Sequence, residues 1–426
     1  APEFGMWRDR QRTRLLPRIK AGLVSLMDHA RRSGDISRLG RYGERLLAID
    51  DLTEEGIRAQ MEVSAFAGDR LTALRIYDEW SQRLLRELGA TPSRQLDGMA
   101  VRLRRRAWER PRSSVVPEVR TEEWRDRPFC GRTREYRAIY DLWEGVKAAR
   151  PYHVLLMGES GVGKTTLIDR LATSLAMEGA AVARVRCFEM ERSIPYAALA
   201  SGLSRLIDQP GAAATSPASL AEIARFVPEA RARFPDLPAP VDAPGESTRI
   251  QFAEAVLELL TAVMEEQPVV LVIDDYHIAD EASLTVLHML IRRLPDRPLM
   301  VLLSARPLLP PEGGAARIRD GAERLGLTEM TLEPMPLEEG NEYLDALVRD
   351  LPSAPSLVER RILLGTSGGF PLALEHLVAD WTRRGSASLA LSLGGMSPDV
   401  PSLPGGTYHR LAGSLTDSLS PLARLV

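Results

Sequence analysis

Cysteine and long apolar runs are both scarce in this sequence. Its 426 residues include two cysteines, Cys130 and Cys187, which are too few to hold a fold together by disulfides, so we expect a reducing cytoplasm. No apolar run approaches the roughly 18 residues of a membrane-spanning helix. No signal peptide is visible, and the histidines show no zinc spacing. The length is enough for two to four domains.

Lysine is rare as well. Of the 55 basic residues, only Lys20, Lys147 and Lys164 are lysines. The net charge is −3, yet residues 6–110 carry 22 basic against 15 acidic side chains. This region could face nucleic acid or an acidic partner. Its arginines recur at helical spacing among apolar residues, however, and that pattern is more typical of an ordinary solvated helix face.

Helical periodicity covers residues 17–110, where apolar residues recur at i, i+3, i+4 and i+7. Two Gly-Asp pairs, Gly34-Asp35 and Gly68-Asp69, are 34 residues apart, the period of a tetratricopeptide (TPR) repeat. In each pair the glycine is expected to end one helix and the aspartate to cap the next. Residues 1–5, "APEFG", are interpreted as an expression-vector remnant.

The pattern changes after a polar, proline-punctuated linker at 111–126. Short apolar segments then alternate with helical ones, which predicts a mostly parallel five-stranded sheet with crossover helices. The predicted strands are 153–157, 181–187, 268–273, 299–304 and 327–333. Residues 209–247, rich in Ala, Pro and Gly, are interpreted as an insertion.

These patterns predict a multidomain chain. An all-α, TPR-like domain spans 6–110, and an α/β domain with the mostly parallel five-stranded sheet spans 127–334. Residues 335–426 are helical again, and we interpret them as a helical lid and the start of a further domain.

The segment from Gly158 to Thr165 matches the phosphate-loop pattern G-x-x-x-x-G-K-[ST]. Its glycines let backbone N–H groups surround phosphates, and the helix that follows adds its positive N-terminal end. Lys164 is expected to reach the β- and γ-phosphates, and the Thr165 hydroxyl to ligate Mg²⁺. The expected nucleotide-binding residues of this loop are Gly158, Glu159, Ser160, Gly161, Val162, Gly163, Lys164, Thr165 and Thr166.

A second acidic strand end accompanies the loop. Asp274 closes the apolar segment "PVVLVID" and is expected to hold Mg²⁺ as a Walker-B aspartate does. Asp275 is placed to orient or deprotonate the attacking water; the alternative is that it only caps the next turn. The strand at 299–304 is expected to lie between this strand and the one before the loop. Arg306 would then reach the same sheet edge as a γ-phosphate sensor, unless it is an ordinary strand-end arginine.

Two further stretches carry a family resemblance. "PFCGRTREYRAIYDLW" at 128–143 resembles the hhGRxxE motif of signal-transduction ATPases with numerous domains, the STAND class. "GTSGGFPLALEHL" at 365–377 resembles their GxP region. The resemblance implies that the α/β domain at 127–334 is a P-loop NTPase of the ASCE/STAND type. It also implies that Arg132 and Pro371 lie near the adenine of bound ATP or ADP. By spacing alone, the first could be a turn and the second a helix start.

The helical part, from "GDISRLGRYGERLL" to "ELGATPSRQL", resembles the bacterial transcriptional activation domain (BTAD) of SARP-like regulators. Activation domain followed by STAND ATPase is the order found in large SARP-like proteins, and LuxR-type regulators carry a similar ATPase module. In such regulators a winged helix-turn-helix usually precedes the activation domain. Residues 6–16 are too short for one, so we expect a chain cut at both ends or a variant without its own DNA reader.

The resemblance implies a slow ATPase that acts as a switch in transcription regulation and signal transduction. It would self-associate in its ATP state and contact the transcription machinery or another regulatory protein through the N-terminal helices. DNA would be bound only through a domain that is absent here, and no membrane would be involved. Two other functions stay open: a work-performing ATPase, although "TSGGF" is not the LSGGQ signature of transporter ATPases, and an interaction scaffold whose nucleotide is never hydrolysed.

Overall fold

The computed structural model describes residues 2–104, 129–240, 245–307, 312–349 and 351–384. The chain forms two compact units. The first contains Ala1–Arg125, Thr133–Met157 and Leu167–Met330. The second contains Asp126–Arg132, Gly158–Thr166 and Thr331–Val426. The predicted linker at 111–126 lies outside the described residues, as does everything after 384.

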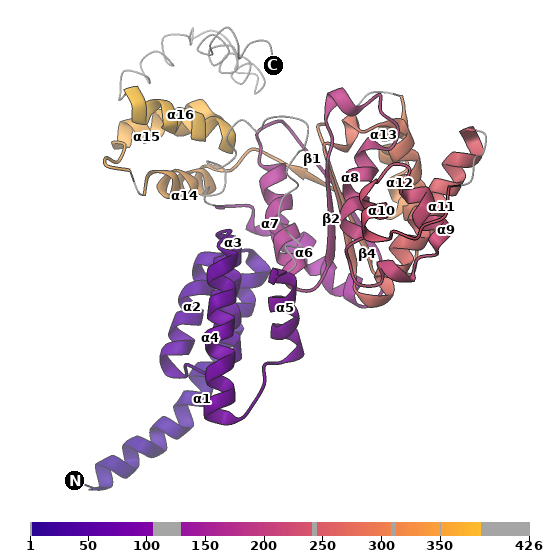
Figure 1. The fold of residues 1–426 in the computed structure, drawn as a ribbon. Coiled ribbons are helices and arrows are strands. Elements are labelled where there is room, and N and C mark those ends of the chain that lie inside the picture. Colours follow the sequence, from indigo (N-terminus) through magenta and orange to yellow (C-terminus); the bar gives the residue numbers. More distant parts are fainter. Residues whose placement is uncertain (1, 105–128, 241–244, 308–311, 350, 385–426) are drawn as a thin grey trace. The chain divides into compact units, whose positions relative to one another are not determined.

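Five helices make up the N-terminal region (Figure 1). They are α1 (Pro2–Ser33), α2 (Ile36–Ile49), α3 (Glu54–Phe66), α4 (Arg70–Leu88) and α5 (Arg94–Arg104). The periodicity predicted a helix only from residue 17, but α1 begins at Pro2 and carries Pro17 inside it. The residues before Pro17 are mostly strong helix formers such as Arg, Leu, Gln and Met, which explains why the helix continues through the proline.

The two predicted Gly-Asp turns are confirmed. Gly34 and Gly68 have φ values of +70° and +77°, in the left-handed region that favours glycine. Each aspartate side chain accepts a hydrogen bond from the backbone N–H three residues later, at 2.9 Å for Asp35 and 3.0 Å for Asp69. The same turn therefore joins α1 to α2 and α3 to α4.

A five-stranded sheet has the order β2-β3-β4-β1-β5. The strands are β1 (Tyr152–Gly158), β2 (Ala181–Arg186), β3 (Val269–Asp274), β4 (Leu299–Ala305) and β5 (Leu327–Leu332). Each predicted strand is confirmed to within one residue at either end. β4 pairs in parallel with both β3 and β1, so it lies between them as predicted. The carboxyl ends of β1, β3 and β4 consequently share one edge of the sheet.

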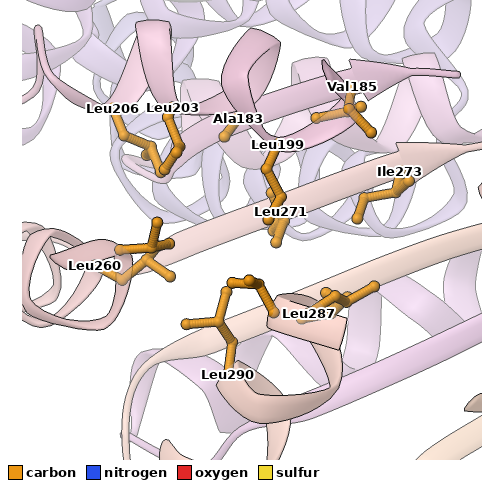
Figure 2. Packing of buried hydrophobic residues seen from close by; sticks show 14 of the residues in the cluster. Ala183, Val185, Leu199, Leu203, Leu206, Leu260, Leu271, Ile273, Leu287 and Leu290 are labelled. Carbon is orange, nitrogen blue, oxygen red and sulfur yellow. The ribbon is translucent and has the colours of Figure 1, made fainter. Parts of the chain in front are cut away.

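Helices cover both faces of the sheet: in Figure 1, α6 and α7 lie on one side, and α8, α11 and α12 on the other. The helices of this region are α6 (Thr133–Lys147), α7 (Lys164–Met177), α8 (Ala197–Leu206), α9 (Pro217–Ile223), α10 (Glu229–Arg233), α11 (Gly245–Glu266), α12 (Glu281–Arg293) and α13 (Gly314–Asp320). Figure 2 shows leucines of α8, α11 and α12 packed on side chains of β2 and β3. Burying these apolar faces is the main force that stabilises such a layered fold.

The second unit contains α14 (Leu337–Val348), α15 (Leu357–Ser367) and α16 (Pro371–Arg384). Their shared core includes Tyr343, Leu344, Leu363, Leu374, Leu377 and Trp381. α15 begins with a capping box, in which the Ser356 and Glu359 side chains each accept the other's backbone N–H.

Within the first unit, the N-terminal helices contact the far end of α7. The Arg170 guanidinium lies 4.3 Å from the centre of the Phe66 ring and donates a hydrogen bond to the Gly34 carbonyl at 3.2 Å. Arg102 donates to the Met177 carbonyl at 2.8 Å. Met177 also packs into the apolar core of the N-terminal helices. The helix that follows the phosphate loop therefore ends against the N-terminal region.

In the part of the chain that the structure describes, no helix is both long enough and apolar enough to cross a membrane.

Candidate nucleotide-binding site

The phosphate loop joins β1 to α7. β1 ends at Gly158 and α7 begins at Lys164. Gly161 and Gly163 have φ values of +80° and +103°, which side chains rarely adopt. A Cβ at Gly158 would lie 2.9 Å from the Leu332 carbonyl oxygen, so a residue with a side chain would not fit there. The backbone path of the loop therefore requires glycine at these positions.

The Lys164 side chain is 7% exposed, and its ammonium turns back over the loop. Nζ donates to the Gly158 carbonyl at 2.8 Å and to the Glu159 carbonyl at 3.1 Å. Thr165 is half-buried on the first turn of α7, whereas Thr166 is exposed. A buried ammonium, positive-φ glycines and a helix N-terminus together form a cradle that suits phosphate groups.

Both residues that the STAND resemblance placed near the base lie against the phosphate loop in the second unit. The Arg132 guanidinium donates to the Val162 carbonyl at 3.0 Å. Pro371 is the first residue of α16, and its ring would be 3.9 Å from a Cβ at Gly163. The backbone N–H of Leu372 donates to the Gly161 carbonyl at 3.3 Å. The structure thus brings the two predicted motifs to one loop.

Asp274 and Asp275 belong to the first unit, at the carboxyl end of β3. Asp274 is 1% exposed, and its Oδ1 accepts a hydrogen bond from Ser304 Oγ at 2.5 Å. The same Ser304 hydroxyl accepts the Asp275 backbone N–H at 2.8 Å. Ser304 therefore holds both acidic residues, a role that we did not predict. Its one sequence signal is a polar residue near the end of the otherwise apolar strand β4.

Asp275 adopts a left-handed conformation, with φ +56°, which is strained for a residue with a side chain. It occupies the N-cap position of the short 3₁₀ turn Tyr276–Ile278, but its side chain makes no cap hydrogen bond. That side chain is 29% exposed. A strained, accessible carboxylate beside a buried one is suited to handling water.

Asp274 has a second contact that the sequence did not predict. Arg184, on β2, forms an ion pair with Asp169 of α7, and its Nη2 lies 3.8 Å from Asp274 Oδ2. Arg184 is 14% exposed. A guanidinium between two carboxylates offsets the cost of burying them together.

Neighbouring groups limit the chemistry at this strand edge. Burial, with Asp274 nearby, raises the pKa of the Cys187 thiol far above its usual range, so the thiol stays protonated and is a poor nucleophile. Arg306 follows β4 and is exposed.

No group of three or more His, Cys, Asp or Glu side chains in the described ranges could hold a metal alone. Mg²⁺ fits such a site because it commonly takes one or two protein ligands together with substrate phosphates.

Two family models match different parts of the chain. Residues 2–104 match the bacterial transcriptional activator domain, and residues 128–302 match the AAA ATPase domain. An uncharacterised protein of Rhizobium meliloti (strain 1021) is 24% identical over 274 residues, which cover 59% of this chain and 25% of that protein. The chain thus spans about a quarter of the length of this curated relative.

Solved structures with a similar fold were also found. A Walker-type ATPase of Pyrococcus abyssi is 16% identical, with 75% of this chain and 79% of that chain covered and a TM-score of 0.42. The Drosophila ORC bound to DNA is 16% identical over 78% and 72% of the two chains, with a TM-score of 0.40. The Aeropyrum pernix ORC2 protein is 15% identical over 74% and 75%, with a TM-score of 0.36. It is the two family-model matches that place a bacterial transcriptional activator domain, at 2–104, before an AAA ATPase domain, at 128–302, in this chain.

Proposed function

We propose that this chain is the nucleotide-switched region of a bacterial transcriptional regulator. It binds ATP or ADP with Mg²⁺, hydrolyses ATP slowly, and changes conformation and assembly with its nucleotide state. The observation that carries the proposal is the complete phosphate loop, with Lys164 buried over it at the start of α7. The matches of residues 2–104 to an activator domain and of residues 128–302 to an ATPase domain support it.

The proposed chemistry assigns one task to each residue. The loop from Gly158 to Gly163 binds phosphates through its N–H groups, and Lys164 neutralises the β- and γ-phosphates. Thr165 and Asp274 hold Mg²⁺, which supplies charge neutralisation during phosphoryl transfer. Asp275 orients the attacking water and accepts its proton.

Ser304 and Arg306 complete the assignment. Through its bonds to Asp274 Oδ1 and the Asp275 N–H, Ser304 keeps the two acidic groups in fixed relative positions. Arg306, exposed after β4, senses the γ-phosphate.

We favour a switch over a work-performing ATPase because the flanking helical region is of a kind that binds other proteins. The repeated turn at Gly34 and Gly68 supports a TPR-like module, through which the transcription machinery or another regulatory protein would bind. ATP can shift the conformation only if its γ-phosphate makes contacts that exist in one state alone. Arg306 is the proposed source of that difference. A cytoplasmic location and membership of the STAND class belong to the same proposal.

Two measurements test the proposed switch: the rate of ATP turnover and the molecular mass in each nucleotide state. A work ATPase should exceed about 1 per second, within the ordinary enzyme range; the switch should be far slower, and a scaffold should show none. With ATP, the Asp275→Asn variant should gain mass by light scattering, whereas ADP should keep it monomeric. Equal mass with ATP, with ADP and without nucleotide would favour the scaffold.

A further inference from the structure

Arg132 lies inside the second unit. Its side chain is 3% exposed, and its backbone has φ +58°. The guanidinium donates through Nη2 to two backbone carbonyls, Val162 at 3.0 Å and Glu333 at 2.5 Å. Val162 is part of the phosphate loop, and Glu333 follows β5 directly. One side chain thus joins the loop to the segment that leads into the lid helices.

The backbone at Arg132 is fixed as well. Its N–H donates to the Glu339 carboxylate of α14 at 3.1 Å. The preceding Gly131 has φ +68°, and a Cβ there would displace the Glu339 side chain. The turn that presents Arg132 is therefore held by α14.

The hydrogen bond from Arg132 to the Val162 carbonyl also determines where the Gly163 N–H points. A trans peptide is planar, with its C=O and its N–H on opposite sides. Fixing the Val162 oxygen towards Arg132 therefore turns the Gly163 N–H the other way. In a phosphate loop, N–H groups must face the anion and carbonyls must face outward. The contact thus presets a donor for the phosphates.

The lid holds the neighbouring peptide in a similar manner. Leu372, in the first turn of α16, donates its N–H to the Gly161 carbonyl at 3.3 Å. The segment after β5 is in turn tied to the turn before α16, because the Met335 N–H donates to the Gly369 carbonyl at 2.7 Å. Two consecutive outward carbonyls of the loop are therefore held by groups of the same second unit.

We propose that Arg132 is a positioning residue for phosphate recognition. It sets the Val162–Gly163 peptide and couples the shape of the phosphate loop to the lid segment at Glu333, and it does not read the base. This inference rests on the proposed nucleotide binding. It replaces the adenine contact that the family resemblance implied for this side chain with an action through the loop.

Lysine is the informative replacement. An ammonium keeps the positive charge but is a compact point donor, whereas a guanidinium is a rigid, planar fork of donors. If charge alone matters, Arg132→Lys should bind nucleotide like the wild type. If the peptide must be positioned, Arg132→Lys should be nearly as defective as Arg132→Gln. Arg134 is exposed two residues later, so Arg134→Gln is the matched control.

The experiment measures the affinity of the full chain for Mg²⁺–ADP and for Mg²⁺–pyrophosphate by calorimetry, with displacement of a fluorescent ADP analogue for the weaker ligand. We expect Arg132→Lys to lose about tenfold for both ligands, equivalent to about 1.4 kcal/mol, and Arg134→Gln to lose neither. Glu339→Ala, which frees only the backbone N–H, should show the same equal loss on a smaller scale. Because Glu339→Ala leaves the Arg132 side chain in place, it still tests the inference if the Arg132 variants do not fold.

A loss for ADP with pyrophosphate affinity unchanged would show that Arg132 contacts the nucleoside, and would overturn the inference. Wild-type affinity for both ligands in Arg132→Lys and Glu339→Ala would overturn it too. If the wild type itself binds neither ligand, the proposed nucleotide binding fails instead. The two failures are therefore distinguishable.

Discussion

The contact between Arg170 and Phe66 predicts a measurable coupling between the activator domain and the helix that follows the phosphate loop. The guanidinium lies 4.3 Å from the ring centre, and a partly buried cation–π contact contributes about 1 kcal/mol. The hydrogen bond from Arg170 to the Gly34 carbonyl adds roughly 1.5 kcal/mol, because the donor is charged. Arg170→Ala should therefore lower the free energy of unfolding by about 2–3 kcal/mol.

A double-mutant cycle isolates the ring contact. Phe66→Leu keeps an apolar side chain but removes the aromatic face, and Arg170→Ala removes the cation. Urea unfolding followed by tryptophan fluorescence should give a coupling energy of about 1 kcal/mol between the two changes. Arg38 is 59% exposed, so Arg38→Ala should barely change the midpoint. A coupling energy below about 0.3 kcal/mol would refute the view that the activator domain is anchored to α7 through this pair.

Four other variants test the strand edge and the sheet. Asp275→Asn should keep ATP binding yet stop phosphate release in a colorimetric assay, and Asp274→Asn should lose the Mg²⁺ dependence of binding; wild-type hydrolysis by Asp275→Asn would remove its catalytic role. Ser304→Ala should lower kcat at least tenfold with little change in ADP affinity, because it frees both acidic groups, and a wild-type kcat would rule out this positioning. Burial lowers the pKa of His153 from 6.5 to about 4, so the unfolded chain takes up a proton below about pH 6.5 while the folded chain does not. The free energy of unfolding should thus fall by about 2 kcal/mol between pH 7.5 and pH 5, at about 1.4 kcal/mol per pH unit below 6.5. The His153→Leu variant should flatten this pH dependence. Equal pH slopes for the wild type and the variant, measured by urea unfolding, would contradict the lowered pKa of His153.

Local patterns made much of the fold predictable. The central strands β3 and β4 are short apolar runs, and the phosphate loop fixes which strand precedes it. The Gly-Asp turns were predictable because a left-handed glycine and an aspartate cap are local requirements at Gly34 and Gly68. The extent of α1 was not predictable from periodicity, because the residues before Pro17 lack the apolar stripe that marks a packed helix.

The contacts that organise the site depend on residues far apart in the chain. Arg184 reaches Asp169 and Asp274 only because the sheet order places β2 beside β3. Nothing around Arg170 distinguishes it from the many exposed arginines of the sequence. A motif could indicate that Arg132 matters, but only the structure shows that its guanidinium engages the Val162 carbonyl. Sequence patterns thus predicted which residues serve the nucleotide better than they predicted how those residues are held.

Binding of Mg²⁺–ADP to the wild type and to Lys164→Ala, measured by calorimetry, tests the central claim most directly. The chain offers a close control, since Lys20 pairs with Asp50 in the activator domain and Lys20→Ala makes the same chemical change far along the sequence from the loop. We predict at least a tenfold loss of affinity, about 1.4 kcal/mol, for Lys164→Ala and none for Lys20→Ala. Equal affinity in all three proteins, or no binding by the wild type, would contradict the account.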